Sequence, residues 1–212
     1  MNRGPYIFLG AFAVLALSWA GSVLANQLGF GAVTPHYDAL ESASFPSPMP
    51  GIAKRGEMVY KDLGCAVCHT QQVRRADVAS DIARGWGERA SVGRDFIQNK
   101  SVQFGSNHIG PDLRNVGARM TDPNKLYRLL YDPGEGVRKP AYRFLFEEQE
   151  IVGQASPDAL DVAVNPGYEV VPTERARSLV AYLSSLNDTY SYPEVNFVPP
   201  TEQDAPPEEE GN

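Results

Sequence analysis

The sequence has few cysteines, few histidines and no strongly basic stretch. Two of its 212 residues are cysteine and three are histidine, and 26 acidic residues against 19 Lys and Arg give a formal net charge of -7. Nucleic-acid-binding proteins normally present a basic face, so this balance argues against nucleic acid as a partner. The sequence also lacks a Ser-His-Asp pattern and paired carboxylates near a base. It therefore predicts no catalytic site of its own.

The two cysteines belong to a C-x-x-C-H motif, in which Cys65 and Cys68 are followed by His69. This spacing is the attachment signature of c-type haem, where each thiol adds to a porphyrin vinyl group and the imidazole binds iron. A zinc site would need further nitrogen or sulfur ligands. A thioredoxin-like redox pair would need a βαβ context, which is missing. The motif predicts one covalently bound haem c, with Cys65 and Cys68 as attachment points and His69 as an iron ligand.

One long apolar run lies near the N-terminus. Residues 6–25 carry no charge, and about twenty residues suffice to cross a bilayer as a helix. Arg3 precedes the run, which predicts a cytoplasmic N-terminus with the rest of the chain outside. A cleaved signal peptide is the alternative, because the run ends at residues 23–25 in small residues, such as Ala25, that a signal peptidase accepts. The length favours an uncleaved, single-pass anchor in the cytoplasmic membrane, with the haem domain on the periplasmic side.

Composition divides the chain into four parts. Residues 1–28 form the predicted transmembrane anchor, and residues 29–51, rich in Pro and Ser, are interpreted as a linker. Residues 52–188 are predicted to form one mono-haem domain. Residues 189–212, rich in Pro and Glu, are predicted to be a disordered acidic tail.

Three helices are predicted inside the domain. The first covers residues 52–63 and ends at Gly64, directly before the motif. Two further helices are expected at residues 123–131, capped by Asp122, and at residues 173–186, which begin with the cap Thr173. Gly56 leaves room for another helix to approach the first one, and the last helix is the expected partner. Residues 144–171 show no clear periodicity and are expected to be loop-like.

The chain resembles a class I cytochrome c domain and, more narrowly, the membrane-anchored mono-haem cytochrome subunit of cbb-type haem–copper oxidases. The segments that carry the resemblance are GCAVCHTQ (64–71), Arg74, FGS (104–106), GPDL (110–113), VG (116–117) and PAY (140–142). The resemblance implies an all-α fold, with few helices around one haem and long loops. It also implies single-electron transfer without catalysis. The partners that it implies are a membrane redox complex or oxidase subunits, and a soluble cytochrome.

The resemblance also assigns two residues around the iron. The carbonyl of Pro111 is expected to accept a hydrogen bond from the far nitrogen of His69, which fixes the ring orientation. Members of such families supply a methionine to the second iron face in a Met-Pro step, whereas Lys139 stands at that place here. Met120, which precedes the middle helix, is interpreted as core packing.

Three readings of the sixth iron position remain. A neutral Lys139 amine can bind iron if burial lowers its pKa by several units. Another side chain can take the position, or the position can be open or hold water. An open position would make the chain a haem-based gas sensor or a peroxidase-like protein, which is the alternative function.

Overall fold

The computed structural model describes residues 3–31, 33–107, 109–134, 136, 139–193 and 195. His108 and most of the predicted tail lie outside the described residues. The chain falls into two compact units, one formed by Met1–Ser47 with Val92–Ile97 and the other by Pro48–Ser91 with Gln98–Asn212. The predicted boundaries at 28, 51 and 188 remain predictions.

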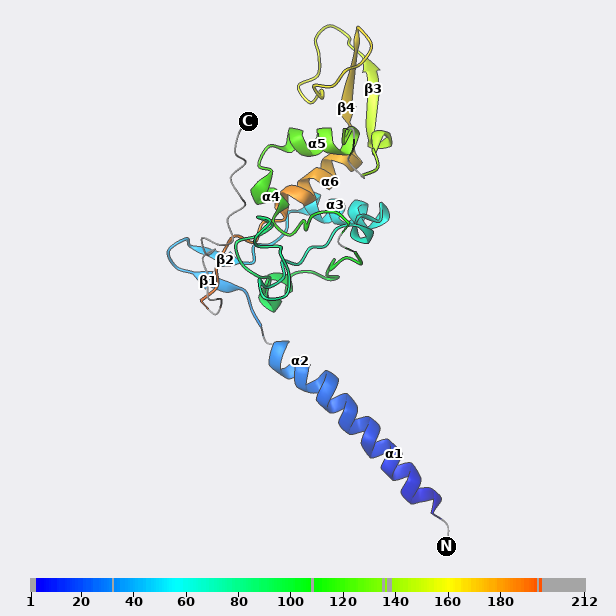
Figure 1. Cartoon of the computed structure of the whole chain (residues 1–212), viewed down its shortest axis with the longest axis vertical. Coiled ribbons are helices and arrows are strands. Elements are labelled where there is room, and N and C mark those ends of the chain that lie inside the picture. The colour runs from blue at the N-terminus through cyan, green and yellow to red at the C-terminus, as the bar shows by residue number, and fades with distance from the viewer. Residues whose placement is uncertain are drawn as a thin grey trace, which may run out of the picture. The chain divides into compact units, whose positions relative to one another are not determined.

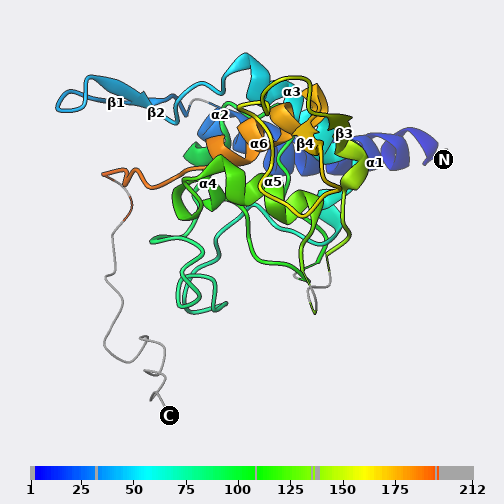
Figure 2. The same ribbon diagram turned by 90° about the horizontal axis from the view of Figure 1, so that it is seen from above.

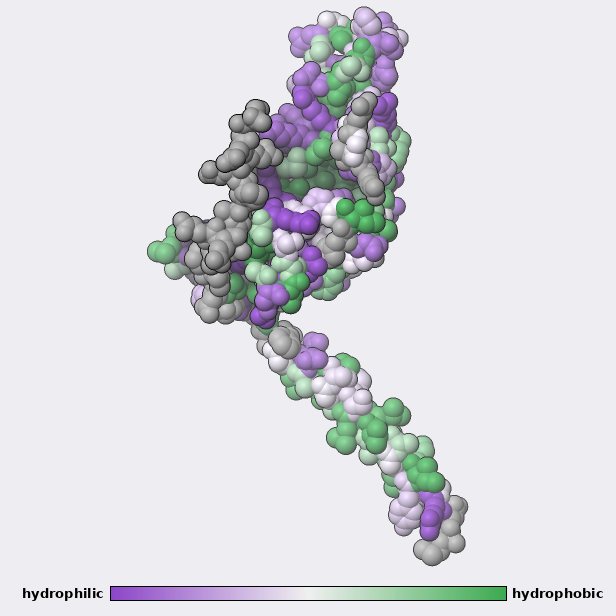
Figure 3. Space-filling model, in the orientation of Figure 1, coloured by the Kyte–Doolittle hydropathy of each residue, from purple (hydrophilic) through white to green (hydrophobic). Residues whose placement is uncertain are grey.

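The first unit begins with a long apolar helix (Figure 1). Helix α1 (Gly4–Trp19) continues through π-helical turns at Ala20–Leu24 into α2 (Ala25–Phe30). Its stretch Gly4–Gly29 is long and apolar enough to cross a membrane, and Figure 3 shows hydrophobic residues along its surface. The helix thus meets the length and composition requirements of the predicted anchor.

A short hairpin lies inside the segment that was interpreted as a linker. Strand β1 (His36–Asp38) pairs antiparallel with β2 (Ala43–Phe45). The Asp38 carboxylate accepts a hydrogen bond from the backbone N–H of Leu40 at 2.8 Å, an Asx-type contact that closes the turn. The strands are only three residues long, too short for alternation to have revealed them.

The three predicted helices of the second unit are confirmed. They are α3 (Gly51–Asp62), α5 (Pro123–Tyr131) and α6 (Glu174–Ser185), with the short α4 (Val116–Arg119) in addition. The Asp122 side chain accepts from Asn124 N at 3.0 Å, and Thr173 Oγ1 accepts from Ala176 N at 3.3 Å, so both caps are present. Helix α6 lies between α3 and α5 in both ribbon views (Figures 1 and 2).

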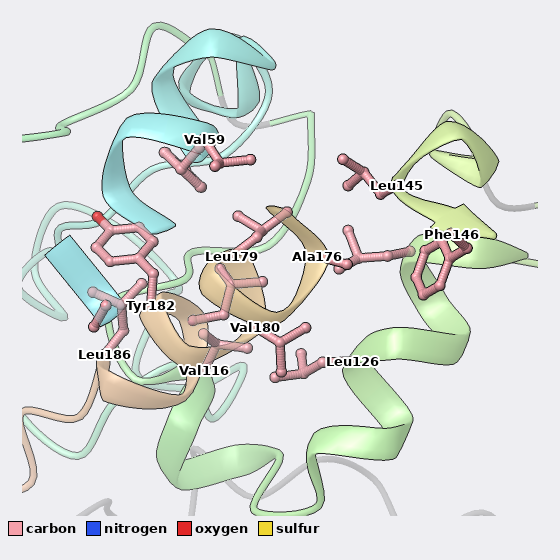
Figure 4. Packing of buried hydrophobic residues seen from close by; sticks show 14 of the residues in the cluster. Val59, Val116, Leu126, Leu145, Phe146, Ala176, Leu179, Val180, Tyr182 and Leu186 are labelled. Carbon is pink, nitrogen blue, oxygen red and sulfur yellow. The ribbon is translucent and has the colours of Figure 1, made fainter. Parts of the chain in front are cut away.

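Helices α3 and α6 cross at Gly56, as the sequence predicted. A Cβ atom at Gly56 would lie 1.8 Å from Ser178 O, so any side chain there would force the helices apart. Tyr60 and Tyr182 meet edge to face beside this crossing, with ring centroids 5.4 Å apart. The core continues along α6 through Leu179 and Val180 (Figure 4). The crossing therefore fixes the helix that leads into the C-x-x-C-H motif.

The all-α expectation holds only in part, because a second hairpin follows the middle helix. Strands β3 (Phe146–Glu150) and β4 (Tyr168–Pro172) pair antiparallel, with Phe146 opposite Pro172. The loop prediction for residues 144–171 was wrong at these strands. Strand β3 is exposed along its four polar residues, so it shows no alternation of apolar and polar positions. The partner strand buries Val170 and Val171, and its burial stabilises the pair.

Candidate haem site

The C-x-x-C-H motif forms a single tight turn at the end of α3. Gly64 has a φ of 68°, a left-handed conformation that glycine adopts without strain. The backbone N–H groups of Cys68 and His69 both donate to Cys65 O, at 3.2 and 3.0 Å. Cys65 and Cys68 are free, half-buried thiols. The turn therefore brings two thiols and one imidazole together within five residues.

The His69 ring is oriented by Pro111. Nδ1 of His69 lies 2.9 Å from the carbonyl oxygen of Pro111. A carbonyl only accepts, so Nδ1 carries the ring proton and Nε2 keeps its lone pair. This hydrogen bond is the one expected from the sequence, while binding of iron by His69 stays a prediction. Burial lowers the pKa of His69, and the Pro111 hydrogen bond opposes that effect. The neutral ring is the form that binds metal ions.

A loop over residues 105–113 is joined to the motif by backbone hydrogen bonds. We refer to residues 64–72 as the His69 segment. The bonds run from Ser106 N to Ala66 O (2.9 Å), from Gly110 N to Cys68 O (2.9 Å) and from Leu113 N to Thr70 O (2.8 Å). They carry the Pro111 carbonyl to the imidazole from a distant part of the sequence.

Two glycines of this loop touch His69. A Cβ atom at Gly110 would lie 2.3 Å from His69 Cε1, and one at Gly105 would lie 2.4 Å from His69 O. Gly105 also has a φ of 81°, which other residues rarely adopt. Both glycines occur in the motifs quoted above, but the sequence did not show that they lie against His69.

Asp112 is a site residue that the sequence reading did not single out. It is fully buried, and its carboxylate accepts from the Thr70 hydroxyl at 2.6 Å and from the backbone N–H groups of Gln72 and Arg114 at 2.8 Å each. Its place directly after Pro111 in a G-P-D-L motif was the available signal. A fully buried carboxylate is unusual, and this one satisfies buried donors on both sides of the site.

Lys139 lies near the motif and is half-buried. We refer to residues 139–142 as the Lys139 segment. The Lys139 ammonium donates to Leu129 O at the end of α5 and lies 5.8 Å from the centre of the Tyr142 ring. Burial lowers the pKa of Lys139 to about 8, while interaction with the Cys65 thiol works in the opposite direction. The charge of Lys139 also lowers the pKa of His69. Lys139 is thus within electrostatic range of both residues.

Tyr142 connects the two segments. Its hydroxyl hydrogen-bonds the Cys65 side chain, and burial, the largest cause, raises the pKa of Tyr142 to about 12. Met120 is partly buried against the hydrophobic core, in agreement with its interpretation as packing. The structure thus gathers Cys65, Cys68 and His69 with Pro111 and, at longer range, Lys139.

The donor set fits a c-type haem. Two thiols precede one imidazole in the same turn, and the Nε2 of that imidazole is available to bind a metal ion. Within the described part of the chain, no group of three or more His, Cys, Asp or Glu side chains converges in a way that could hold a bare metal ion. An iron porphyrin would need only one such side chain here, because the porphyrin nitrogens themselves bind the iron.

Comparison with known proteins places the chain in a family. Among curated proteins, none matches it. The family described as "Cytochrome C oxidase, mono-heme subunit/FixO" matches residues 36–178, more than half of the chain. The matched stretch contains the motif, the loop that carries Pro111 and Asp112, and Lys139. The chain therefore belongs to this family of mono-haem subunits of cytochrome c oxidase.

Proposed function

We propose that the chain is a membrane-anchored electron-transfer subunit, which carries one covalently bound haem c and passes single electrons. The observation that carries the proposal is the geometry of His69. Its ring donates to Pro111 O through Nδ1 and presents Nε2 as a metal ligand, one residue after the second of two half-buried thiols. Membership of the mono-haem oxidase-subunit family supports the same conclusion.

Each residue has a distinct role in this proposal. Cys65 and Cys68 form thioether links that hold the haem permanently, and His69 binds iron through Nε2. Pro111 holds the ring in one tautomer and orientation, which strengthens the imidazole as a donor. The bound haem supplies a one-electron Fe³⁺/Fe²⁺ couple, and the protein supplies the position and polarity of its surroundings.

Lys139 is proposed as the sixth iron ligand. Its half-buried amine lies within electrostatic range of Cys65 and His69, and burial favours its neutral form. To hold the iron of a bound haem, the amine would have to give up its hydrogen bond to the Leu129 carbonyl. The presence of lysine where methionine is expected also supports the alternative function. In that alternative the sixth position is open, and the chain is a haem-based sensor or a peroxidase-like protein.

The N-terminal helix is proposed as the anchor, with the haem domain on the periplasmic side of the cytoplasmic membrane. Arg3 at its start supports this orientation. Oxidase subunits are then the immediate partners, and a soluble cytochrome is a further donor or acceptor. The anchor would raise the effective concentration of the haem at the oxidase.

Electron exchange by the full chain, purified in mild detergent, tests the proposed function. We expect co-purification with oxidase subunits, reversible one-electron titration, and electron exchange with a soluble cytochrome. Addition of CO to the reduced protein separates the two functions, because an open iron binds CO at once and a protein-ligated iron resists it. A prompt Soret shift with CO, together with no electron exchange, would overturn the proposal in favour of the alternative.

A further inference from the structure

Asp112 is buried at the centre of the contacts that hold His69. None of its surface is exposed. Its Oδ2 accepts from the Thr70 hydroxyl (2.6 Å) and from the backbone N–H of Gln72 (2.8 Å), and its Oδ1 accepts from the backbone N–H of Arg114 (2.8 Å). These donors are uncharged, so they solvate the carboxylate without adding a positive charge. The carboxylate therefore accepts hydrogen bonds both from the His69 segment and from the loop that carries Pro111.

The carboxylate ties together the two segments that meet at the imidazole. Thr70 follows His69, and Asp112 follows Pro111, so the Thr70–Asp112 bond runs directly beside the His69–Pro111 bond. Loss of the carboxylate would leave the Thr70 hydroxyl and two backbone N–H groups without their acceptor, which is unfavourable in a buried site. Relief of that cost requires the two segments to shift, and the shift would change the orientation of the ring.

The charge of Asp112 also reaches the ring. Asp112 is joined directly to Pro111, whose carbonyl accepts from the ring, and its carboxylate is bonded to Thr70, the residue after His69. In a buried environment such interactions are screened less than in water. A negative charge beside an iron-bound imidazole stabilises Fe³⁺ relative to Fe²⁺. It therefore favours the oxidised state.

We propose that Asp112 is a positioning residue for His69, whose carboxylate both holds the ring and lowers the reduction potential of the iron bound there. The inference rests on the proposed function, because it requires haem bound through His69. Asp112 touches neither the iron nor a substrate, and it acts only through the imidazole and its support.

The substitution Asp112→Asn removes the charge and keeps an acceptor oxygen. At a fixed ambient potential near the midpoint, we expect the ratio of reduced to oxidised haem to rise at least tenfold, which is about 59 mV for one electron. Asp81→Asn is the matched control. Asp81 is also fully buried, and it binds the Arg74 side chain and backbone instead. Its substitution is expected to leave the ratio unchanged.

Two variants of Thr70 separate charge from general loosening. Thr70→Val removes one hydrogen-bond donor to Asp112 but keeps the carboxylate. The negative charge of that carboxylate is then less well compensated. We expect the reduced-to-oxidised ratio to fall, opposite in sign to Asp112→Asn. Thr70→Ser keeps the hydroxyl and should restore the original ratio. General damage to the site would move Asp112→Asn and Thr70→Val in the same direction.

The results assign failure to one proposal or the other. An unmodified protein without haem contradicts the proposed function itself. A haem protein in which Asp112→Asn behaves like Asp81→Asn, or in which Thr70→Val raises the ratio, overturns the role of Asp112 alone. If Asp112→Asn does not mature, the Thr70 pair decides. A fall of the reduced-to-oxidised ratio in Thr70→Val with no fall in Thr70→Ser supports the proposal. Equal ratios in these two variants overturn it.

Discussion

The two segments that carry the candidate iron ligands are built differently. The His69 segment is joined to the loop at residues 105–113 by backbone bonds, by the Asp112 carboxylate, and by two glycines that touch His69. The Lys139 segment is held by the bond from Tyr142 N to Leu130 O (2.7 Å), by the Lys139 ammonium on Leu129 O, and by the contact of Tyr142 with Cys65.

This difference indicates where the site tolerates change. A substitution in the His69 segment disturbs contacts on several sides at once. A substitution at Lys139 changes one side chain, whose main hydrogen bond is to the backbone carbonyl of Leu129. This difference agrees with the sequence. The chain has lysine at position 139, where methionine is expected, but its C-x-x-C-H and G-P-D-L motifs are intact.

The largest effect is expected from Gly110→Ala, which would break the His69 segment directly. The new Cβ would lie 2.3 Å from His69 Cε1, so the ring or the loop must move. We expect most of the covalently bound haem to be lost, measured as Soret absorbance per mole of protein. Gly51→Ala is the control, because nothing lies within 4 Å of its Cβ position. Equal haem content in the two variants would show that the close contact does not matter.

The support beneath the His69 segment is tested by Gly56→Ala. A Cβ 1.8 Å from Ser178 O forces α3 away from α6, and we expect a loss of about 3 kcal/mol in the free energy of unfolding. Denaturant titration measures it, with Gly51→Ala in the same helix as the control. A loss no greater than that of the control would mean that the helices do not cross at this point.

The Lys139 segment is tested by Lys139→Met. If residue 139 faces the iron, a thioether in place of an amine should raise the midpoint potential, by on the order of 100 mV. Lys125→Met, on the exposed surface of α5, is the control for loss of one positive charge. Identical potentials and spectra in the Lys139 variant and the unmodified protein would remove Lys139 from the iron.

A smaller effect concerns the pH dependence of stability beside the His69 segment. Burial raises the pKa of Tyr182 to about 12, and its hydroxyl donates to Gln71 at 2.8 Å. Above pH 10 the unfolded chain loses this proton and the folded chain keeps it. The unfolded state then binds fewer protons, so stability must fall as the pH rises from 10 towards 12.

We expect this single group to account for roughly 1–2 kcal/mol of that fall. Urea unfolding at pH 9 and pH 11 measures it. Tyr182→Phe should flatten the decline, while Tyr168→Phe, at a partly exposed tyrosine of β4, should not. A decline as steep in Tyr182→Phe as in the unmodified protein would assign the effect to other residues.

Local signals made most of the helical framework predictable. The caps, the helix end at Gly64 and the room that Gly56 leaves for a second helix are encoded within a few residues, and the structure confirms them. The hairpin of β3 and β4 was missed because its exposed strand is polar throughout, and its pairing depends on a partner eighteen or more residues away. A local pattern contains no information about such a partner.

The site was predictable to a similar degree. The C-x-x-C-H motif points to Cys65, Cys68 and His69 by their spacing alone, because all three lie in one turn. The role of Asp112 depends on Thr70 and Gln72, some forty residues earlier in the chain. Only the fold brings these groups together, so the G-P-D-L motif points to Asp112 but does not show that its carboxylate is buried against Thr70 and Gln72.

The most direct test of the account is the mass and pigment of the mature protein. Acidified acetone removes non-covalent haem and leaves thioether-linked haem on the polypeptide. We predict that the extracted chain stays coloured, and that a peptide containing Cys65 and Cys68 is heavier by the mass of one haem. A colourless chain, or a peptide with two unmodified thiols, would contradict the account.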